Sequence, residues 1–354
     1  MTGGLMQLVA YGGQDLQITG NPQITFFKTI YKQHTNFAIE TIQQDCNGEI
    51  QDCGEGARIG VTIARAGDLL SNLYIVIKRK TFTYSGKEIF YPSLGYRYIK
   101  NVELTIGGQV IDKHYGDWLC IWNDLTLPFN KKIQLNKLLY GKQVDRVSDR
   151  VNLIDGDVYI PLNFWFCNNA GLALPLIALQ YHKVELNIYL DSNPFKETSK
   201  YLLQIPNNEP KLIDMSGIGN TIEDIEVWAD YILLDTKERT KFSTCGHEYL
   251  IEQIQTMEPM CLDKNACNLR IKLRFNHPVK ELIWYMDIGE LKDLSNNNFG
   301  SGYRKRVEIV KNAYIKLNSQ ERFRKRKGSY FTDFQRYQYH TGLNIQDLQS
   351  SFFI

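Results

Sequence analysis

A long uncharged segment in the middle of the chain is the feature that most restricts its fold. Residues 158–182 contain no Asp, Glu, Lys or Arg, and a segment of this length is long enough to cross a bilayer as a helix. Pro161 and Pro175 would interrupt such a helix, and several Asn side chains would need partners in the hydrocarbon layer. We therefore expect this segment to lie in the core of a protein domain and not in a membrane.

The same segment is predicted to form two strands joined by a loop. Residues 159–167 are apolar enough for a buried strand, residues 168–171 contain the turn formers Asn and Gly, and residues 177–190 return as a half-buried strand. The alternation at the end of the segment places four apolar side chains on one side, Val184, Leu186, Ile188 and Leu190. Because side chains of a strand point alternately to its two faces, the segment indicates an antiparallel β domain.

Alternation with a period of two recurs along the chain. It predicts further strands at residues 59–63, 73–77, 102–106, 225–233, 271–275 and 313–317. Short helices are predicted at residues 115–125, where apolar side chains recur at helical spacing, and at residues 235–242, where Asp235 and Glu238 resemble a capping box. Many short strands separated by Gly, Pro and Asn turns favour an all-β fold of antiparallel sandwiches.

Length and composition favour two domains. A chain of 354 residues exceeds what one core usually fills. Residues 192–216 are rich in Asn, Pro, Lys and Glu, and alternation stops there and resumes at Ile222. We therefore place the domain boundary in this segment. The first residues lack the basic and apolar regions of a secretory leader, so a secretory route is not expected.

Patterns that support catalysis or cofactor binding are absent from the sequence. The six histidines are scattered, no metal-binding motif contains them, and the seven cysteines include no C-x-x-C pair. The sequence has no nucleophile elbow and no phosphate-binding glycine loop. We therefore predict no catalytic residue, no metal ligand and no cofactor. The net charge of +2 also excludes a chain that binds nucleic acid by its overall charge.

One region of the chain is strongly basic. Residues 302–327 hold many cations against only Glu308 and Glu321. Such a run contacts DNA, an anionic lipid layer or a neighbouring subunit, or it is simply a solvated loop beside a strand. The candidate contact residues are Arg304, Lys305, Arg306, Arg322, Arg324, Lys325, Arg326 and Lys327.

Four stretches of the chain resemble one protein family. Residues 159–188, YIPLNFWFCNNAGLALPLIALQYHKVELNI, resemble the strand–loop–strand signature of the major capsid proteins of nucleocytoplasmic large DNA viruses. Residues 3–38 resemble that family's N-terminal arm and first strand. Residues 235–255 and 317–340 are similar to its later helix-and-strand block and to the loop that enters its last strands. These matches span nearly the whole chain in the order that the family has.

The resemblance implies a fold and a set of partners. It implies a double jelly roll with an arm at residues 1–24, a first jelly roll at 25–205 and a second at 206–354. It also implies a structural subunit of an icosahedral virion, assembled in the host cytoplasm, whose homotrimers contact neighbouring capsomers, minor capsid proteins and an internal viral membrane. No specific nucleic acid or small-molecule substrate is implied.

The resemblance also implies a role for the N-terminal arm. The arm would become ordered against a neighbouring subunit or an underlying membrane, whereas the simplest alternative is a frayed terminus. The apolar side chains that would supply this contact are Leu5, Met6, Leu8, Val9 and Tyr11.

The chain departs from the family pattern at its end, because the family normally continues well beyond the stretch YFTDFQRYQYHT. The second jelly roll is therefore expected to lack its last strands. Three interpretations remain open: the product of a split gene, a shortened paralogue that acts as a minor virion component or needs a partner chain, and a degenerate copy. A glycan-binding attachment module is a further alternative, with residues 296–303, NNNFGSGY, as its candidate site.

Overall fold

A computed structural model describes most of the chain. It describes residues 34–48, 57–79, 82–84, 94–140, 152–154, 156–191, 202–203, 211–212, 222–258, 260, 268–285, 310–342 and 352–353, together with scattered residues before 34. The chain divides into two units, Met1–Phe37 and Ala38–Ile354. The second unit contains the sheets and helices discussed below.

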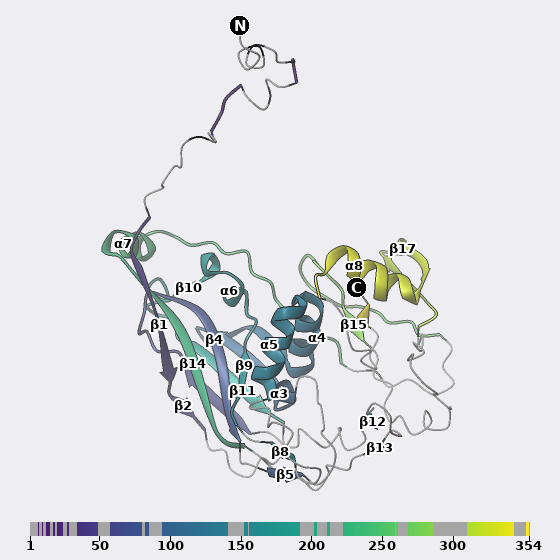
Figure 1. Ribbon diagram of the computed structural model, residues 1–354, viewed down its shortest axis with the longest axis horizontal. Helices are drawn as coiled ribbons and strands as arrows, with labels where there is room; N and C mark the ends of the chain where they lie inside the picture. Colours follow the sequence, from purple (N-terminus) through teal and green to yellow (C-terminus); the bar gives the residue numbers. More distant parts are fainter. Residues whose placement is uncertain are drawn as a thin grey trace. The chain divides into compact units, whose positions relative to one another are not determined.

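Two five-stranded antiparallel sheets form the first half of the chain (Figure 1). The first, here the β4 sheet, has the order β1 (Phe37–Gln44), β14 (Ile222–Leu234), β4 (Leu69–Arg79) and β10 (Leu174–Pro175), and β9 (Val158–Pro161) also pairs with β4. The second, here the β11 sheet, has the order β2 (Cys46–Asn47), β3 (Arg58–Thr62), β11 (Val184–Leu190), β6 (Ile99–Ile106) and β7 (Gln109–Tyr115).

The two sheets share one hydrophobic core. Ile75 of β4 and Val227 of β14 belong to the same cluster of buried side chains as Leu104 of β6 and Leu186 of β11. In β11 the alternation operates as predicted, because Val184, Leu186, Ile188 and Leu190 are buried. Complete burial of such a side chain stabilises the fold by roughly 1.5–3 kcal/mol, so this core supplies the main driving force for the sandwich.

The middle segment, from Val158 to Leu190, forms three strands, and its first and last strands lie in opposite sheets. β9 pairs with β4, whereas β11 lies between β3 and β6. Both strands are shorter than predicted: the chain leaves β9 after Pro161, and β11 begins only at Val184. Between them come β10, α6 (Trp165–Asn168) and η1 (Ala170–Leu172). The predicted strand at 159–167 is thus wrong beyond Pro161, because the buried aromatic residues that follow fill the core from a turn and a short helix.

The predicted helices are confirmed. α4 (Gly116–Thr126) buries Leu119, Ile121 and Leu125, and α3 (Leu94–Arg97) and α5 (Phe129–Tyr140) lie near it. α7 (Thr236–Thr244) begins after Asp235, whose side chain accepts a hydrogen bond from the Thr236 N–H at 2.8 Å. This bond satisfies one of the N–H groups that a helix start leaves without an internal partner. In the part of the chain that the structure describes, no helix has the length and apolarity needed to cross a membrane.

One strand was assigned to the wrong domain. The boundary predicted at residues 205/206 placed the strand near 225–233 in the second jelly roll, but β14 pairs with β4 along most of its length. Tyr231 of β14 is fully buried, and its hydroxyl donates to the Ala64 carbonyl at 2.6 Å. The first sandwich therefore extends to Leu234, because β14 completes the β4 sheet.

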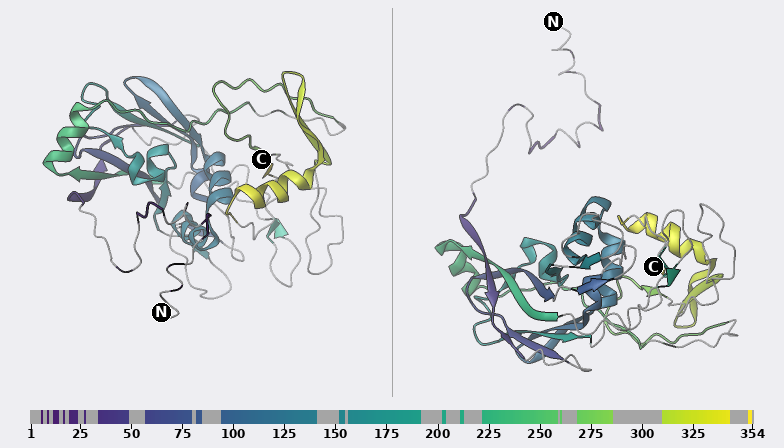
Figure 2. Two further views of the ribbon diagram at one scale, coloured as in Figure 1. Left: turned by 90° about the horizontal axis from the view of Figure 1, so that it is seen from above. Right: turned by 60° about the horizontal axis from the view of Figure 1, so that its bottom comes forward.

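The described residues after Leu234 form smaller pieces. β15 (Trp284–Tyr285) pairs with β18 (Phe352–Phe353), and β16 (Asn312–Leu317) pairs with β17 (Gln320–Lys327). β17 leads into η3 (Tyr330–Gln335) and α8 (Arg336–Tyr339), which Figure 2 shows in yellow.

The strand predicted at 271–275 is not formed, and Ile271 and Leu273 are exposed. Two further short pairs complete the described strands: β5 (Phe82–Tyr84) pairs with β8 (Asn152–Ile154), and β12 (Leu202–Leu203) with β13 (Lys211–Leu212). The fold is mainly β with a few short helices, as predicted.

Candidate functional site

The basic region forms an exposed β-hairpin. β16 and β17 are joined at Asn318 and Ser319, which both adopt positive φ angles of 47° and 68°. Asn tolerates this conformation better than most residues, and turns of this kind suit the twist of paired strands. All side chains of β17 except Phe323 are exposed. The five cations of this strand, Arg322, Arg324, Lys325, Arg326 and Lys327, therefore reach solvent.

Aromatic contacts attach the hairpin to the helix that follows it. Phe323 meets the buried ring of Phe331 edge to face, with centroids 6.4 Å apart, and Trp284 contacts Phe331 from another side at 5.6 Å. The Arg326 guanidinium lies 4.3 Å from the centroid of the Tyr330 ring. Such cation–π contacts stabilise a cation without neutralising its charge. The hairpin is thus fixed on one side and strongly positive at its surface.

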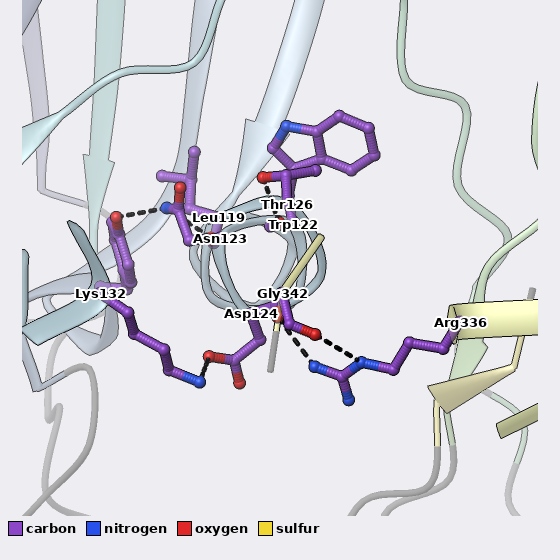
Figure 3. A network of polar contacts seen from close by, with 9 residues as sticks. Leu119, Trp122, Asn123, Asp124, Thr126, Lys132, Arg336 and Gly342 are labelled. Atoms are coloured by element: carbon purple, nitrogen blue, oxygen red, sulfur yellow. Dashed lines mark hydrogen bonds and ion pairs between the residues drawn. The ribbon is translucent and has the colours of Figure 1, made fainter. Parts of the chain in front are cut away.

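The helix after the hairpin is attached to the end of α4 (Figure 3). The last four carbonyl groups of an α-helix have no partner within the helix, and they carry the negative end of its dipole. In α4 all four accept hydrogen bonds, and three of the donors come from the segment 336–342. The Leu127 N–H donates to the Asn123 carbonyl at 3.1 Å, and Arg336 Nη2 donates to the Asp124 carbonyl at 2.9 Å. The Gly342 N–H donates to the Leu125 carbonyl at 2.8 Å, and Thr341 Oγ1 donates to the Thr126 carbonyl at 2.6 Å.

The α4 end of this contact is itself held in the first sandwich. Asp124 is buried and forms an ion pair with Lys132 of α5. Asn123 donates to the Tyr96 hydroxyl at 2.6 Å, and burial raises the pKa of Tyr96 far above its usual range, so this phenol stays neutral. Side chains on three helices therefore fix the base on which the segment 336–342 rests.

A second connection joins the halves through Asp112 of β7. Its Oδ1 accepts from the Ile254 N–H at 3.0 Å, and its Oδ2 lies 2.8 Å from Nε2 of His114. Gln253 also donates to the Ile111 carbonyl at 2.6 Å. The His114 ring stacks on Phe164 with centroids 4.4 Å apart. Asp112 and His114 are both buried, so the chain that leaves α7 is attached to the core of the first sandwich.

Comparison with known families decides what this architecture belongs to. The family model described as major capsid protein N-terminus matches residues 25–235, and the model described as large eukaryotic DNA virus major capsid protein matches residues 238–345. The chain belongs to the major capsid proteins of large eukaryotic DNA viruses.

Individual capsid proteins agree with this assignment. The major capsid protein of Pyramimonas orientalis virus is 41% identical over 96% of this chain and 76% of its own length. That of Paramecium bursaria Chlorella virus 1 is 39% identical over 96% of this chain and 78% of its own length. A solved structure described as the PBCV-1 virus capsid, quasi-atomic model, matches with a TM-score of 0.65 at 33% identity, covering 93% of this chain and 80% of the solved one. The predicted capsid-protein resemblance and jelly-roll fold are therefore confirmed.

The structure describes only some of the residues proposed as contacts of this capsid protein. Arg304, Lys305 and Arg306 lie outside the described residues, as do the apolar arm residues Leu5, Leu8 and Tyr11 and the candidate glycan loop 296–303. Met6 and Val9 are described and are 62% and 72% exposed. The cations of β17 lie together on one strand, and their role as contacts stays a prediction. No cluster of three or more His, Cys, Asp or Glu side chains suited to a metal occurs among the described residues.

Sequence reasoning did not find two features of the capsid protein. The attachment of Arg336 and Gly342 to α4 has no local signal, because its partners are more than 200 residues away in the chain. The second feature is an aromatic patch on the outer face of the β4 sheet, around Tyr74 and Trp228. A signal for it existed, since the alternation of β14 assigns Trp228 to the face opposite the core.

Proposed function

We propose that this capsid protein is the repeating structural subunit of an icosahedral shell, and that three copies form a trimer of pseudo-hexagonal outline. Its membership of the major capsid protein family, matched across both halves of the chain, is the observation that carries this proposal. A trimer of chains with two sandwiches each presents six similar units around one axis. Closed rotational symmetry of this kind lets one surface contact a different surface of the next copy.

In this proposal the two halves of the chain are joined into one rigid subunit. The first jelly roll includes the strands from β1 to β14, and the second begins after β14. The contacts of α4 with the segment 336–342 and of Asp112 with Ile254 hold described parts of both halves together. Rigidity supports tiling, because a subunit whose halves rotated freely would not present a constant shape to its neighbours.

The subunit acts within the virion by shape and contact, without catalysis. Its partners are further copies of itself, neighbouring capsomers and minor capsid proteins, and assembly takes place in the host cytoplasm. The exposed Met6 and Val9 of the N-terminal arm supply apolar surface for a neighbouring subunit or an internal membrane. The cations of β17 face an acidic surface in the assembled particle.

Size-exclusion chromatography with light scattering tests the trimer. We expect the purified chain to have three times its chain mass of 41.1 kDa, and electron-microscopy averages to show a pseudo-hexagonal outline. A monomer at every concentration would contradict the trimer. A monomer that trimerises only with a second viral capsid protein would identify instead a minor component completed by a partner chain. Absence of the protein from purified particles would contradict the structural role altogether.

A further inference from the structure

The outer face of the β4 sheet carries a row of rings that crosses three strands. Trp228 of β14 lies opposite Tyr74 of β4, and Tyr74 lies opposite Pro161 of β9. The Trp228 and Tyr74 rings are stacked, with centroids 6.4 Å apart and an angle of 4° between their planes. In the adjacent row Tyr159 lies opposite Val76 and is 40% exposed. These side chains form a continuous patch, here called the aromatic patch.

The aromatic patch does not belong to the core of its own sandwich. The alternate residues of the same strands, such as Ile75 and Val227, fill that core. In an antiparallel sheet with one solvated face, the outward side chains are usually polar. Trp and Tyr are instead the side chains that contribute most often to the buried centres of protein interfaces. The composition of the patch therefore indicates a contact surface.

Acidic side chains of β14 flank Trp228 at one side of the aromatic patch. Asp224, Glu226 and Asp230 lie on β14, with Lys78 as the neighbouring cation on β4. The Glu226 carboxylate accepts from Trp228 Nε1 at 3.0 Å, and the hydrogen bond from Lys78 lowers the pKa of Glu226. Asp230 accepts from Thr41 at 2.6 Å and from Asn72 at 3.1 Å. The rim is thus ordered and negatively charged, with three carboxylates against one lysine.

The β16–β17 hairpin has the complementary character. Its cations include Arg324 and Lys325, which form no ion pair with any other described residue, and its exposed apolar side chains include Tyr314 and Leu317. A two-stranded hairpin without further contacts is only marginally stable in water. Phe323 anchors one side of this hairpin, and the other side carries cations for which the described part of the chain supplies no ion-pair partner. A negatively charged aromatic surface would give the hairpin further packing contacts and would also supply counter-charges for its cations.

We propose that the β16–β17 hairpin of one copy docks on the aromatic patch and acidic rim of a second copy. The inference rests on the proposed trimer and names its contact. Two different surfaces meet in this contact, so each copy uses its hairpin on one neighbour and its sheet on the other, as ring closure requires. A nucleic acid or an anionic lipid layer would account for the hairpin alone, since the acidic rim would repel either one. A second copy accounts for both surfaces.

The test neutralises each surface without changing its shape. One variant carries Glu226→Gln and Asp230→Asn, which keep the acceptor oxygens for Trp228 and Thr41, and a second carries Arg324→Gln and Lys325→Gln. A third carries all four substitutions. The matched control, Lys237→Gln with Lys241→Gln, removes two exposed cations from α7. Light scattering across a salt series gives the trimer dissociation constant, and thermal melts show whether each variant is folded.

We expect each paired variant to raise the dissociation constant about tenfold or more, and the control to leave it unchanged. In the variant with all four substitutions, the dissociation constant should rise by less than the product of the two separate increases, because both pairs of substitutions remove the same contacts. Higher salt should weaken the original trimer. An original chain that forms trimers while all variants match it would overturn the inference and leave the proposed function intact. An original chain that never trimerises would instead overturn the proposed function.

Two binding measurements test whether the hairpin binds DNA or an anionic lipid layer instead of a second copy. Binding to a DNA duplex and to vesicles with an anionic lipid is measured for the original chain and for the Arg324→Gln, Lys325→Gln variant. Loss of either binding, with the trimer unaffected, would assign the hairpin to that ligand and overturn the inference. Loss of the trimer with both bindings unchanged would support it.

Discussion

The guanidinium of Arg336 donates through Nη2 to the main-chain oxygen of Asp124, at 2.9 Å and across 212 residues of sequence. The same guanidinium donates through Nε to the Gly342 carbonyl at 3.3 Å. A positive group at the C-terminal end of a helix is favourable because that end carries partial negative charge. Arg336 thus joins the end of α4 to the helix that supports the basic hairpin.

Substitution of Gly342 by Ala should break this junction. A β-carbon at position 342 would lie 2.2 Å from the Asp124 oxygen and 2.6 Å from the Leu125 oxygen, so the segment 336–342 would have to move. We expect a local destabilisation of roughly 1–3 kcal/mol. Hydrogen exchange should show faster exchange in residues 310–342 than in the original chain, with the two sheets of the first sandwich unaffected.

Gly246→Ala is the matched control, because a β-carbon there meets nothing within 4 Å. It should leave exchange in residues 310–342 unchanged. Equal exchange in the Gly342→Ala variant and the original chain would show that the junction does not hold the C-terminal helix on α4.

Removal of the Tyr231 hydroxyl should destabilise the first sandwich. This hydroxyl lies 2.6 Å from the Ala64 carbonyl and 3.0 Å from Oε1 of Gln44. Tyr231→Phe leaves these buried acceptors with fewer donors, which costs about 1–2 kcal/mol. Chemical denaturation at neutral pH measures the loss. Tyr181→Phe is the control, since the Tyr181 side chain is exposed.

Stability should fall in alkaline solution. Burial raises the pKa of Tyr231 to about 12 and that of Cys167 to about 12, above their ordinary values. The unfolded chain therefore releases these protons at lower pH than the folded chain, and rising pH favours unfolding. The contribution is complete below about pH 8 and is lost progressively toward pH 12. Denaturation midpoints between pH 7 and 11 check this, and Tyr231→Phe should show a shallower decline.

Asp112 should be essential for the connection between β7 and the chain that follows α7. Asp112→Ala removes the partner of His114 and the acceptor of the Ile254 N–H. Loss of one member of a buried, hydrogen-bonded pair costs about 3 kcal/mol. Thermal unfolding should shift accordingly, and limited proteolysis should cut first near residues 251–255. Glu248→Ala, an exposed acidic residue beyond the same helix, should behave as the original chain does.

Deletion of residues 2–20 should separate folding from assembly. The deletion removes the exposed Met6 and Val9 and leaves both sheets of the first sandwich intact. We expect an unchanged melting temperature and a loss of assembly into particles when the truncated chain is co-expressed with the other capsid components. Normal particles from the truncated chain would contradict the proposed role of the arm.

The sequence by itself determined four strands of the first sandwich, β3, β4, β6 and β11, and which face of β11 is apolar. Alternation depends on neighbouring residues alone, because successive side chains of a strand point to opposite faces. This is why β3, β4, β6 and β11 were predicted from their own residues, and why the buried side of β11 was assigned correctly. The helix α4 followed from local spacing in the same way.

Only the tertiary structure decided which strands pair and which distant groups meet. β14 pairs with β4 about 150 residues earlier, and no pattern within β14 specifies that partner. The same holds for Arg336 and Asp124, since a helix end accepts any suitably placed donor. The aromatic patch and the acidic rim arise from three strands that the chain brings together only when the β4 sheet forms. Local propensity selects elements, whereas burial and hydrogen bonding between distant residues select their arrangement.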